Sequence, residues 1–412
     1  MQRYDTYKDS GVKWLGEIPS HWEIISTKYI AKLYTGNSLN DASKEKYSLF
    51  SDDSYPYIAS KDISLGTGTV DYDNGLYIPK DKSFFEIAPK NSFLLCIEGG
   101  SAGRKKAFLD RNCCFVNKLC CFDSALNPKY HYYFIQGDYF RTMFNCSLQG
   151  MIGGVSVSAL KNFYTIVPPL EEQTAIANYL DTATAKIDAA IAQQQKMIDL
   201  LNERKQIIIN RAVTKGLNPN AKMKDSGVEW IGEVPEEWEV RKLKHIAKLQ
   251  SGETISSDNF TEAGYPVFGG NGFRGYTNRF TNDGDYVLIG RQGALCGNVN
   301  YAHGQFFASE HAVVVYPHKH ENIVWLGEVI RTSNLNQYSQ SAAQPGLAVS
   351  LIQNICYPYP PKEEREEIAL YIAKNIKVID EGIKNYQEQI SLLQERKQII
   401  INEVVTGKVK II

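Results

Sequence analysis

The sequence predicts an α+β protein in which two β-rich domains are separated by two long antiparallel coiled-coil helices. Three observations support this prediction: the chain contains a duplicated frame, each copy carries short apolar segments broken by Gly, Asn, Asp and Pro, and each copy ends in a helical heptad pattern. A chain of 412 residues is also too long for one ordinary hydrophobic core. Length alone therefore indicates two to four domains.

The duplication has two registers. Residues 8–19, KDSGVKWLGEIP, return as residues 224–235, KDSGVEWIGEVP, which lie 216 positions later. Residues 203–210, ERKQIIIN, return unchanged as residues 395–402, only 192 positions later. The stretches between the matching pieces hardly resemble each other, and the second is 24 residues shorter. A common frame with two different inserts indicates two modules that recognise two different things.

A turn-rich lead over residues 1–25 precedes the first β-rich stretch, residues 26–167. Apolar runs bounded by turn residues predict strands at 92–97 and 113–122, and a helical piece at 128–144. This part of the chain should form the first domain.

The first long helix should begin after Pro168 and Pro169, where Glu171 and Glu172 place negative charge at a helix N-terminus. Its predicted seam steps by four and three residues, with two polar exceptions. The seam positions are Ile176, Leu180, Ala183, Ile187, Ala190, Gln194, Met197, Leu201, Arg204 and Ile208. The glycine and proline in the segment 215–219 should end the helix.

The second copy repeats this order. Strands are expected at 286–289 and 312–316, and a tight turn at Gly269–Gly272. A second helix with a weaker seam follows Pro360. Each helix of about 43 residues would be roughly 65 Å long, which suits a ruler between the two domains.

These boundaries give four segments. The predicted division is domain 1 at 1–167, helix 1 at 168–216, domain 2 at 217–359 and helix 2 at 360–412. The first helix leads into the segment 224–238, whereas the second runs out of chain. The segment that would continue it, 8–22, lies at the other terminus. The frame is thus cyclic and cut once, which predicts a pseudo-twofold arrangement with neighbouring termini.

Composition limits the protein class. No run of about 18 apolar residues could span a bilayer, and the N-terminus lacks a secretory signal, so we expect a cytoplasmic protein without membrane contact. The adjacent pairs Cys113-Cys114 and Cys120-Cys121 lack zinc-ligand spacing and are expected to be buried free thiols. The net charge of −1 gives no overall positive excess for nucleic-acid binding, so basic residues should cluster or a partner should supply phosphate contacts.

No catalytic constellation can be assembled from the sequence. The match of residues 268–272 to the F-x-G-x-G pattern of methyltransferases is weak, because no Asn/Asp-Pro-Pro-Tyr/Phe motif is present, and a turn is the better reading. His318 and His320 have no cysteine partner at metal-finger spacing and are expected in a solvated loop. We expect no catalytic residue, no metal and no cofactor.

Two glycine-rich loops are the best candidates for a binding site. Residues 98–105, EGGSAGRK, and residues 291–298, RQGALCGN, each follow an apolar strand. The first lacks the phosphate-loop pattern of nucleotide-binding proteins. Glycine allows close approach to a phosphate backbone, Arg and Lys read guanine, and Asn and Gln read adenine. A hairpin with solvated charges is an equally good reading for any single residue.

Together these features resemble the specificity subunit of a type I restriction-modification system, and the resemblance covers essentially the whole chain. It rests on the W-L/I-G-E-I/V-P leads, the loop at 269–272, the PPLEEQ entry at 168–173 and the segment 342–350, AAQPGLAVS. The first insert departs from that last segment, reading GMIGGVS at 150–156.

The resemblance implies a subunit that is not itself an enzyme. It would bind double-stranded DNA, with one recognition domain per half of a bipartite site. Its implied protein partners are two modification subunits, which use S-adenosylmethionine to methylate adenine, and two restriction subunits, which use ATP to translocate and cleave DNA. The alternatives are a protein-only coiled-coil scaffold and a self-contained DNA methyltransferase.

We expect the DNA-facing residues to lie on or beside the glycine-framed loops of the two inserts. The expected residues are Arg104, Lys105, Lys106, Asn271, Arg274, Arg291, Gln292 and Asn298.

Overall fold

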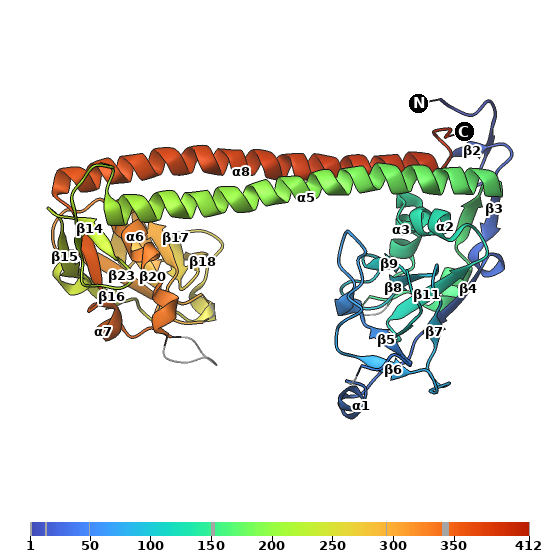
Figure 1. Ribbon diagram of the computed structural model, residues 1–412, viewed down its shortest axis with the longest axis horizontal. Coiled ribbons are helices and arrows are strands. Elements are labelled where there is room, and N and C mark those ends of the chain that lie inside the picture. The colour runs from blue at the N-terminus through green and yellow to red at the C-terminus, as the bar shows by residue number, and fades with distance from the viewer. Residues whose placement is uncertain are drawn as a thin grey trace. The chain divides into compact units, whose positions relative to one another are not determined.

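The computed structural model describes residues 2–12, 15–48, 50–149, 153–293, 295–339 and 346–411. The chain forms two compact units: unit 1 consists of residues 1–195 and 388–412, and unit 2 of residues 196–387. Each unit contains one β-rich domain and one stretch of each long helix. The predicted α+β class is therefore confirmed (Figure 1).

Unit 1 is built from two four-stranded sheets with strand orders β6-β5-β10-β7 and β4-β11-β8-β9. The pair β5–β10 is parallel, and the other pairs in these sheets are antiparallel. Its strands are β1 (Tyr7–Asp9), β2 (Glu17–Pro19), β3 (Glu23–Ser26), β4 (Ala31–Thr35), β5 (Ser54–Ile58), β6 (Tyr77–Pro79), β7 (Ile87–Ala88), β8 (Phe93–Cys96), β9 (Lys106–Phe108), β10 (Cys113–Phe115), β11 (Leu119–Ser124) and β12 (Tyr164–Val167). Its shorter helices are η1 (Thr27–Tyr29), α1 (Asp41–Lys46), η2 (Ser60–Asp62), α2 (Pro128–Phe134), α3 (Asp138–Cys146) and α4 (Val157–Lys161).

Unit 2 repeats this topology, with strand orders β18-β17-β22-β19 and β16-β23-β20-β21 and the parallel pair β17–β22. Its strands are β13 (Met223–Asp225), β14 (Glu233–Pro235), β15 (Glu239–Lys242), β16 (Ala247–Ser251), β17 (Tyr265–Gly269), β18 (Gly272–Thr277), β19 (Asn282–Asp283), β20 (Tyr286–Gly290), β21 (Val299–Ala302), β22 (Gln305–Ala308), β23 (Ala312–Pro317) and β24 (Cys356–Tyr359). Its shorter helices are η3 (Leu243–His245), η4 (Ser257–Asn259), α6 (Ile323–Thr332), η5 (Leu335–Tyr338) and α7 (Val349–Ile352). Two inserts of unlike sequence thus have the same strand arrangement.

Two predicted elements of unit 1 are each divided. The run 113–122 forms two strands, β10 and β11, because the chain passes from one sheet to the other between them. The expected helix over 128–144 is interrupted at Gly137, which precedes α3. The side chain of Asn402 accepts a hydrogen bond from the Asp138 backbone N–H at 2.7 Å and so satisfies the start of α3. A residue distant in sequence therefore stabilises the start of the second of these two helices.

The paired cysteines are buried free thiols, as predicted. Cys113 and Cys114 lie in β10, and Cys120 and Cys121 lie in β11. Burial raises the pKa of all four thiols, to about 12 for Cys114 and about 11 for Cys121. They remain protonated at neutral pH and act as small apolar side chains.

The long helices are α5 (Leu170–Lys215) and α8 (Lys362–Val405). In unit 1, the Lys397 ammonium lies 2.7 Å from the Asp188 carboxylate, and in unit 2 the Lys205 ammonium lies 2.7 Å from Asp380. In each unit, moreover, the start of one long helix and the end of the other contact the same tryptophan, so the two helices run antiparallel within each unit. The predicted antiparallel pairing is confirmed at this level.

The seam of α5 differs from the predicted heptad. Met197 and Arg204, expected in the seam, are exposed, and the unpredicted Ile198 and Ile209 are buried, while Ile187 is buried as predicted. From Ile187 onward, the less exposed residues of α5 include a series that still steps by four and three, at positions 187, 191, 194, 198, 201, 205 and 208. The heptad prediction was therefore wrong by one position at Met197 and Arg204.

A buried tryptophan joins the two long helices in each unit. In unit 1, the Trp22 indole N–H donates to the Glu172 carboxylate at the start of α5, at 3.1 Å. Gly407, just after α8, packs so closely on this indole that a Cβ would lie 2.9 Å from it. In unit 2, Trp238 donates to Glu364 at 2.8 Å, and Gly216 takes the place of Gly407. Both glycines have a φ of +71°, which ends each helix in the left-handed conformation.

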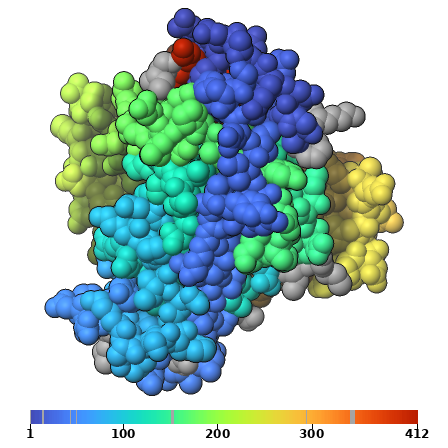
Figure 2. All heavy atoms as spheres, turned by 90° about the vertical axis from the view of Figure 1, so that its right-hand side faces the viewer, coloured from blue at the N-terminus to red at the C-terminus, as the bar shows by residue number. Residues whose placement is uncertain are grey.

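The two ends of the chain meet in unit 1. The Lys410 backbone N–H donates to the Gln2 carbonyl at 2.9 Å, and the Tyr7 hydroxyl donates to the Gly407 carbonyl at 3.0 Å. Figure 2 shows the C-terminal residues in red against the N-terminal segment in blue. Met1 and Ile412 themselves lie outside the described residues. The predicted proximity of the terminal segments is confirmed for the residues next to them.

The contributions of the Trp22–Glu172 and Trp238–Glu364 contacts to the free energy of unfolding should depend differently on pH. Burial works against the charged form of Glu172, but hydrogen bonds from Tyr4, His21 and Trp22 outweigh burial and lower its pKa. A lowered pKa contributes stability above the ordinary glutamate range that is lost as the pH falls through the folded-state pKa. At neutral pH, Glu172→Gln should therefore reduce the free energy of unfolding by about 1 kcal/mol or more, and the deficit should shrink in acid.

Glu364→Gln is the matched control. Burial raises the Glu364 pKa, despite the hydrogen bond from Trp238, so the charged form is disfavoured in the folded protein at neutral pH. Removing this charge should cost less than Glu172→Gln at pH 7, and the two variants should converge as the pH falls. Denaturant unfolding across the pH range measures both. An equal loss at neutral pH would contradict the assigned difference.

A circular permutant tests the cyclic frame. Joining Ile412 to Met1 through a short Gly/Ser linker, and opening the chain at Asn218, should give a folded protein because the new cut replaces the natural one at the equivalent joint. We expect an unchanged circular dichroism spectrum and a melting temperature within a few degrees of the parent. Opening instead after Gln206, inside α5, should prevent folding. If both permutants folded, or if neither did, the prediction that the frame is cyclic and can be opened at Asn218 would be contradicted.

Candidate nucleic-acid interface

The glycine-rich loop of unit 2 connects β20 to β21 and folds back on itself. The Gly297 N–H donates to the Gly290 carbonyl at 2.8 Å, and the Cys296 N–H donates to the Gly293 carbonyl at 3.0 Å. Gly293 and Gly297 both have a φ of +88°, a conformation that residues with a side chain rarely adopt. The loop geometry therefore depends on glycine at these positions.

A second turn packs against this loop through bare backbone. A Cβ on Gly290 would lie 2.2 Å from the carbonyl oxygen of Gly270, in the turn between β17 and β18. Because neither residue has a side chain, the two turns can touch. This contact places Asn271 beside Asn298, whose side-chain amide donates to the Asn271 side-chain oxygen at 3.2 Å. Two exposed amides predicted from separate loops are thus brought together.

Arg291 and Gln292 lie at the start of the same loop. The Arg291 N–H donates to the His311 carbonyl at 2.8 Å, and its carbonyl accepts from the Leu347 N–H at 2.9 Å. Its half-buried guanidinium donates to the Ser251 hydroxyl at 3.2 Å. The side chain of Gln292 is exposed, while its backbone bridges to Gly346. These backbone hydrogen bonds, on both sides of the segment, fix the positions from which the Arg291 and Gln292 side chains extend.

Arg274 is exposed on β18, beside the turn that carries Asn271. Its aliphatic stem crosses Gly269, since a Cβ there would lie 2.4 Å from the Arg274 Cδ, and its guanidinium carbon lies 5.7 Å from the centroid of the Phe260 ring. It forms no ion pair with a residue that the structure describes. All five residues predicted in unit 2 therefore lie on adjoining turns or on the strand next to them.

Unit 1 builds the same loop with different side chains. The Gly103 N–H donates to the Cys96 carbonyl at 2.8 Å, and the Ala102 N–H donates to the Gly99 carbonyl at 2.9 Å, as in unit 2. The flanking bonds also recur: the Ile97 N–H donates to Lys118 and its carbonyl accepts from Val155, both at 2.9 Å. Arg104, which is exposed, takes the position of Asn298, and Ile97 takes that of Arg291.

The two lysines after Arg104 have internal partners. The Lys105 ammonium donates to the Ser60 carbonyl at 2.8 Å, and the Lys106 ammonium donates to the Ile135 carbonyl at 3.2 Å. Burial, together with the nearby Arg141, lowers the Lys106 pKa to about 8. Of the three basic residues predicted in this loop, Arg104 is the one whose charged group has no such bond among the described residues.

The sequence did not predict that a second turn holds each glycine-rich loop in place through a backbone hydrogen bond. Lys118 in unit 1 and His311 in unit 2 accept the equivalent backbone hydrogen bonds, from Ile97 and Arg291, respectively. Lys118 is exposed, and the His311 Nε2 lies 3.0 Å from a Glu310 carboxylate oxygen. Neither turn has a motif of its own, so only the pairing of strands from distant parts of the chain reveals them.

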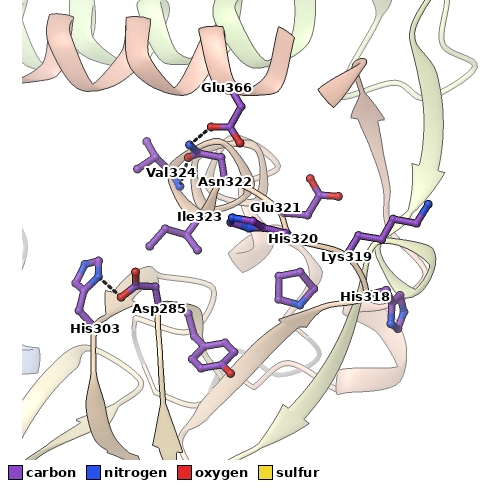
Figure 3. A pocket seen from close by; sticks show the side chains of 12 residues that line it. Asp285, His303, His318, Lys319, His320, Glu321, Asn322, Ile323, Val324 and Glu366 are labelled. Atoms are coloured by element: carbon purple, nitrogen blue, oxygen red, sulfur yellow. Dashed lines mark hydrogen bonds and ion pairs between the residues drawn. The ribbon is translucent and has the colours of Figure 1, made fainter. Parts of the chain in front are cut away.

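A separate pocket of about 830 Å³ in unit 2 contains the histidines expected in a solvated loop (Figure 3). His318, Lys319 and His320 line it together with an exposed pair, His303 and Asp285, whose side chains lie 2.9 Å apart. No Ser, Thr or Cys side chain is among its lining residues. Within the described residues, no group of three or more His, Cys, Asp or Glu side chains could hold a metal ion. The twelve lining residues therefore include no serine, threonine or cysteine nucleophile.

The chain matches the family model of the type I restriction modification DNA specificity domain over residues 19–198 and 235–394. The EcoprrI specificity subunit of Escherichia coli is 46% identical over 137 residues, which are 32% of this chain and 34% of that relative. The MjaVIII specificity subunit of Methanocaldococcus jannaschii is 24% identical, over 98% of this chain and 97% of the relative. The chain belongs to the type I restriction-modification DNA specificity family.

A solved chain from a study of complex assembly and conformational transition of the type I R-M system has the same fold, with a TM-score of 0.71 and 14% identity over 95% of this chain and 99% of the other. The predicted class, a non-catalytic specificity subunit for DNA recognition, is confirmed by the family match and by the names of the relatives. In the part of the chain that the structure describes, no helix combines the length and apolar composition needed to cross a membrane.

The contact between the two glycine turns gives a stability prediction. Gly290→Ala should push the Gly270 turn away, because the new methyl group would overlap a backbone oxygen, and should lower the free energy of unfolding by about 1–3 kcal/mol. Gly100→Ala, in the loop of unit 1, is the control, because a Cβ there meets nothing within 4 Å. Denaturant unfolding should separate the two variants. Equal stability would show that the Gly270–Gly290 contact is not fixed.

Proposed function

We propose that this chain reads a bipartite DNA site, with unit 1 contacting one half and unit 2 the other. The observation that carries the proposal is the recurrence of one glycine-loop backbone in two domains whose exposed side chains differ. A shared backbone would hold each domain against the DNA in a similar way, while different side chains would read different bases. On this proposal, residues 1–167 and 217–359 are the recognition domains, and residues 168–216 and 360–412 are the spacers.

The side-chain chemistry at each loop suits base edges and phosphates. In unit 2, Arg274 and Arg291 offer donors for guanine or phosphate, and Asn271, Gln292 and Asn298 have the amides that pair with adenine. In unit 1, Arg104 occupies the equivalent loop position. Lys105 and Lys106 are retained as predicted contacts, although DNA would have to compete with their bonds to Ser60 and Ile135.

The partners would be double-stranded DNA and the other subunits of a type I system. A net charge of −1 gives this chain little general attraction for DNA, so the modification subunits would share the phosphate contacts. We propose two modification and two restriction subunits per chain, consistent with the duplication of the frame, and a cytoplasmic location, where such a complex would meet DNA.

Replacing Arg291 tests the proposed interface. In the assembled methyltransferase, Arg291→Ala should weaken binding to the cognate duplex by about 1–3 kcal/mol, because a charged donor is lost. Lys224→Ala removes the same charge from an exposed position on β13 and should leave affinity unchanged. Binding is measured by titration at several salt concentrations. Unchanged affinity and salt dependence for Arg291→Ala would remove it from the interface.

A spacer insertion tests the ruler. The two junctions chosen lie between Gln193 and Gln194 in α5 and between Asn385 and Tyr386 in α8. Adding one heptad at both junctions should preserve the seam and lengthen each helix by about 10 Å, or roughly three base pairs of DNA. Methylome sequencing should then show the same half-sites at a longer spacing.

The control carries the heptad in α5 alone. In this variant α5 is one heptad longer than its partner helix, so the paired residues of α5 and α8 can no longer all face each other. It should fail to assemble, whereas the double insertion should assemble normally. A double insertion that methylates sites with the original spacing would show that the helices do not set the distance.

A further inference from the structure

The edge strand β18 of unit 2 contains a β-bulge that turns two neighbouring side chains outward. Phe268 of β17 pairs with Phe273, but the preceding residue, Val267, pairs with Gly275, so Arg274 is the extra residue. Bulges re-aim side chains locally and are frequent at sheet edges. As a result, both Phe273, which is 54% exposed, and Arg274 face solvent instead of alternating between the two faces.

Phe273 is exposed but held in place. Its ring meets Tyr276 edge-on at a centroid distance of 5.0 Å and Phe268 at 6.5 Å. Phe268 in turn contacts the fully buried Phe306 at 5.7 Å, which connects the exposed ring to the core of the domain. A rigid exposed ring loses little conformational entropy when it binds a ligand.

The position of the ring links it to the candidate interface. Phe273 follows Gly272, where a Cβ would lie 3.0 Å from the Asn300 side-chain oxygen, and Asn271 is the partner of Asn298. The neighbouring Arg274 has no ion pair among the described residues. The surface therefore combines a fixed aromatic ring, an uncompensated cation and two amides, which complements a nucleobase next to a phosphate.

We propose that Phe273 stacks on a nucleobase of the half-site read by unit 2, at a step where the duplex opens, with Arg274 on the adjacent phosphate. The inference rests on the proposed DNA-reading function and adds a contact that is independent of hydrogen bonds to base edges. Because the ease of unstacking varies between base steps, this contact would favour flexible steps and contribute specificity through DNA deformability.

The test uses the assembled methyltransferase and its cognate duplex. Phe273→Ala should weaken binding about tenfold, with the salt dependence unchanged because no charge is lost. Phe273→Tyr should keep most of the affinity. Arg274→Ala should instead reduce the salt dependence by about one phosphate contact. Phe280→Ala, which removes another exposed phenylalanine of unit 2, is the control and should bind like the parent.

Single mismatches placed along the half-site locate the opened step. A mismatch at that step should tighten binding by the parent, because the base is already partly unstacked, whereas Phe273→Ala should gain nothing from it. Equal affinity for Phe273→Ala, or the same mismatch profile as the parent, would overturn the inference. Failure of Phe273→Ala to assemble with modification subunits would also overturn it, by making this a protein contact. If the parent complex showed no sequence preference on any duplex, the proposed function itself would fail.

Discussion

The structure depends on one contact that occurs in both units: a buried indole held between the start of one long helix and the end of the other. The Trp22 N–H binds Glu172 of α5 while its ring packs on Gly407, after α8; Trp238 does the same with Glu364 of α8 and Gly216, after α5. The carboxylates lie at helix N-termini, where negative charge is favourable, and the glycines leave room for the rings. This contact fixes each pair of helices in the antiparallel direction and explains why the chain can begin and end beside Trp22.

The glycine-rich loops of the two units also share a feature: their backbone hydrogen bonds are the same, whereas their side chains differ. Left-handed glycines and flanking hydrogen bonds define the same loop in each unit, although Arg104 in one corresponds to Asn298 in the other. In unit 2, bare backbone contact between Gly270 and Gly290 adds a second turn, and a bulge adds Phe273 and Arg274. On the proposed function, such an arrangement would let the bases that are read change without a change in fold.

The duplication is not exact where the domains meet the helices. Gln173 of unit 1, which is buried, donates to the Pro168 carbonyl and accepts from the Asn127 N–H, both at 2.8 Å. Arg365 occupies the equivalent place in unit 2, donates to the Pro360 carbonyl and pairs with the buried Glu321 at 2.8 Å. A buried guanidinium needs a carboxylate partner, whereas an amide does not. The proline carbonyl before each long helix is therefore bonded by a neutral amide in unit 1 and by a guanidinium paired with a carboxylate in unit 2.

The sequence by itself determined the duplicated frame, the α+β class, the two long helices, the buried thiols and the family, because repeats, apolar periodicity and prolines are local signals. Only the tertiary structure decided where these signals were overridden. Asn402 binds the first backbone N–H of α3, where a single helix through Gly137 was expected, and α5 buries Ile198 in place of Met197. The tertiary structure likewise places the Lys105 and Lys106 ammonium groups on backbone carbonyls and brings Asn271 beside Asn298. Each of these outcomes depends on a partner distant in sequence or on the exact twist of a helix, and neither is encoded in the spacing of neighbouring residues.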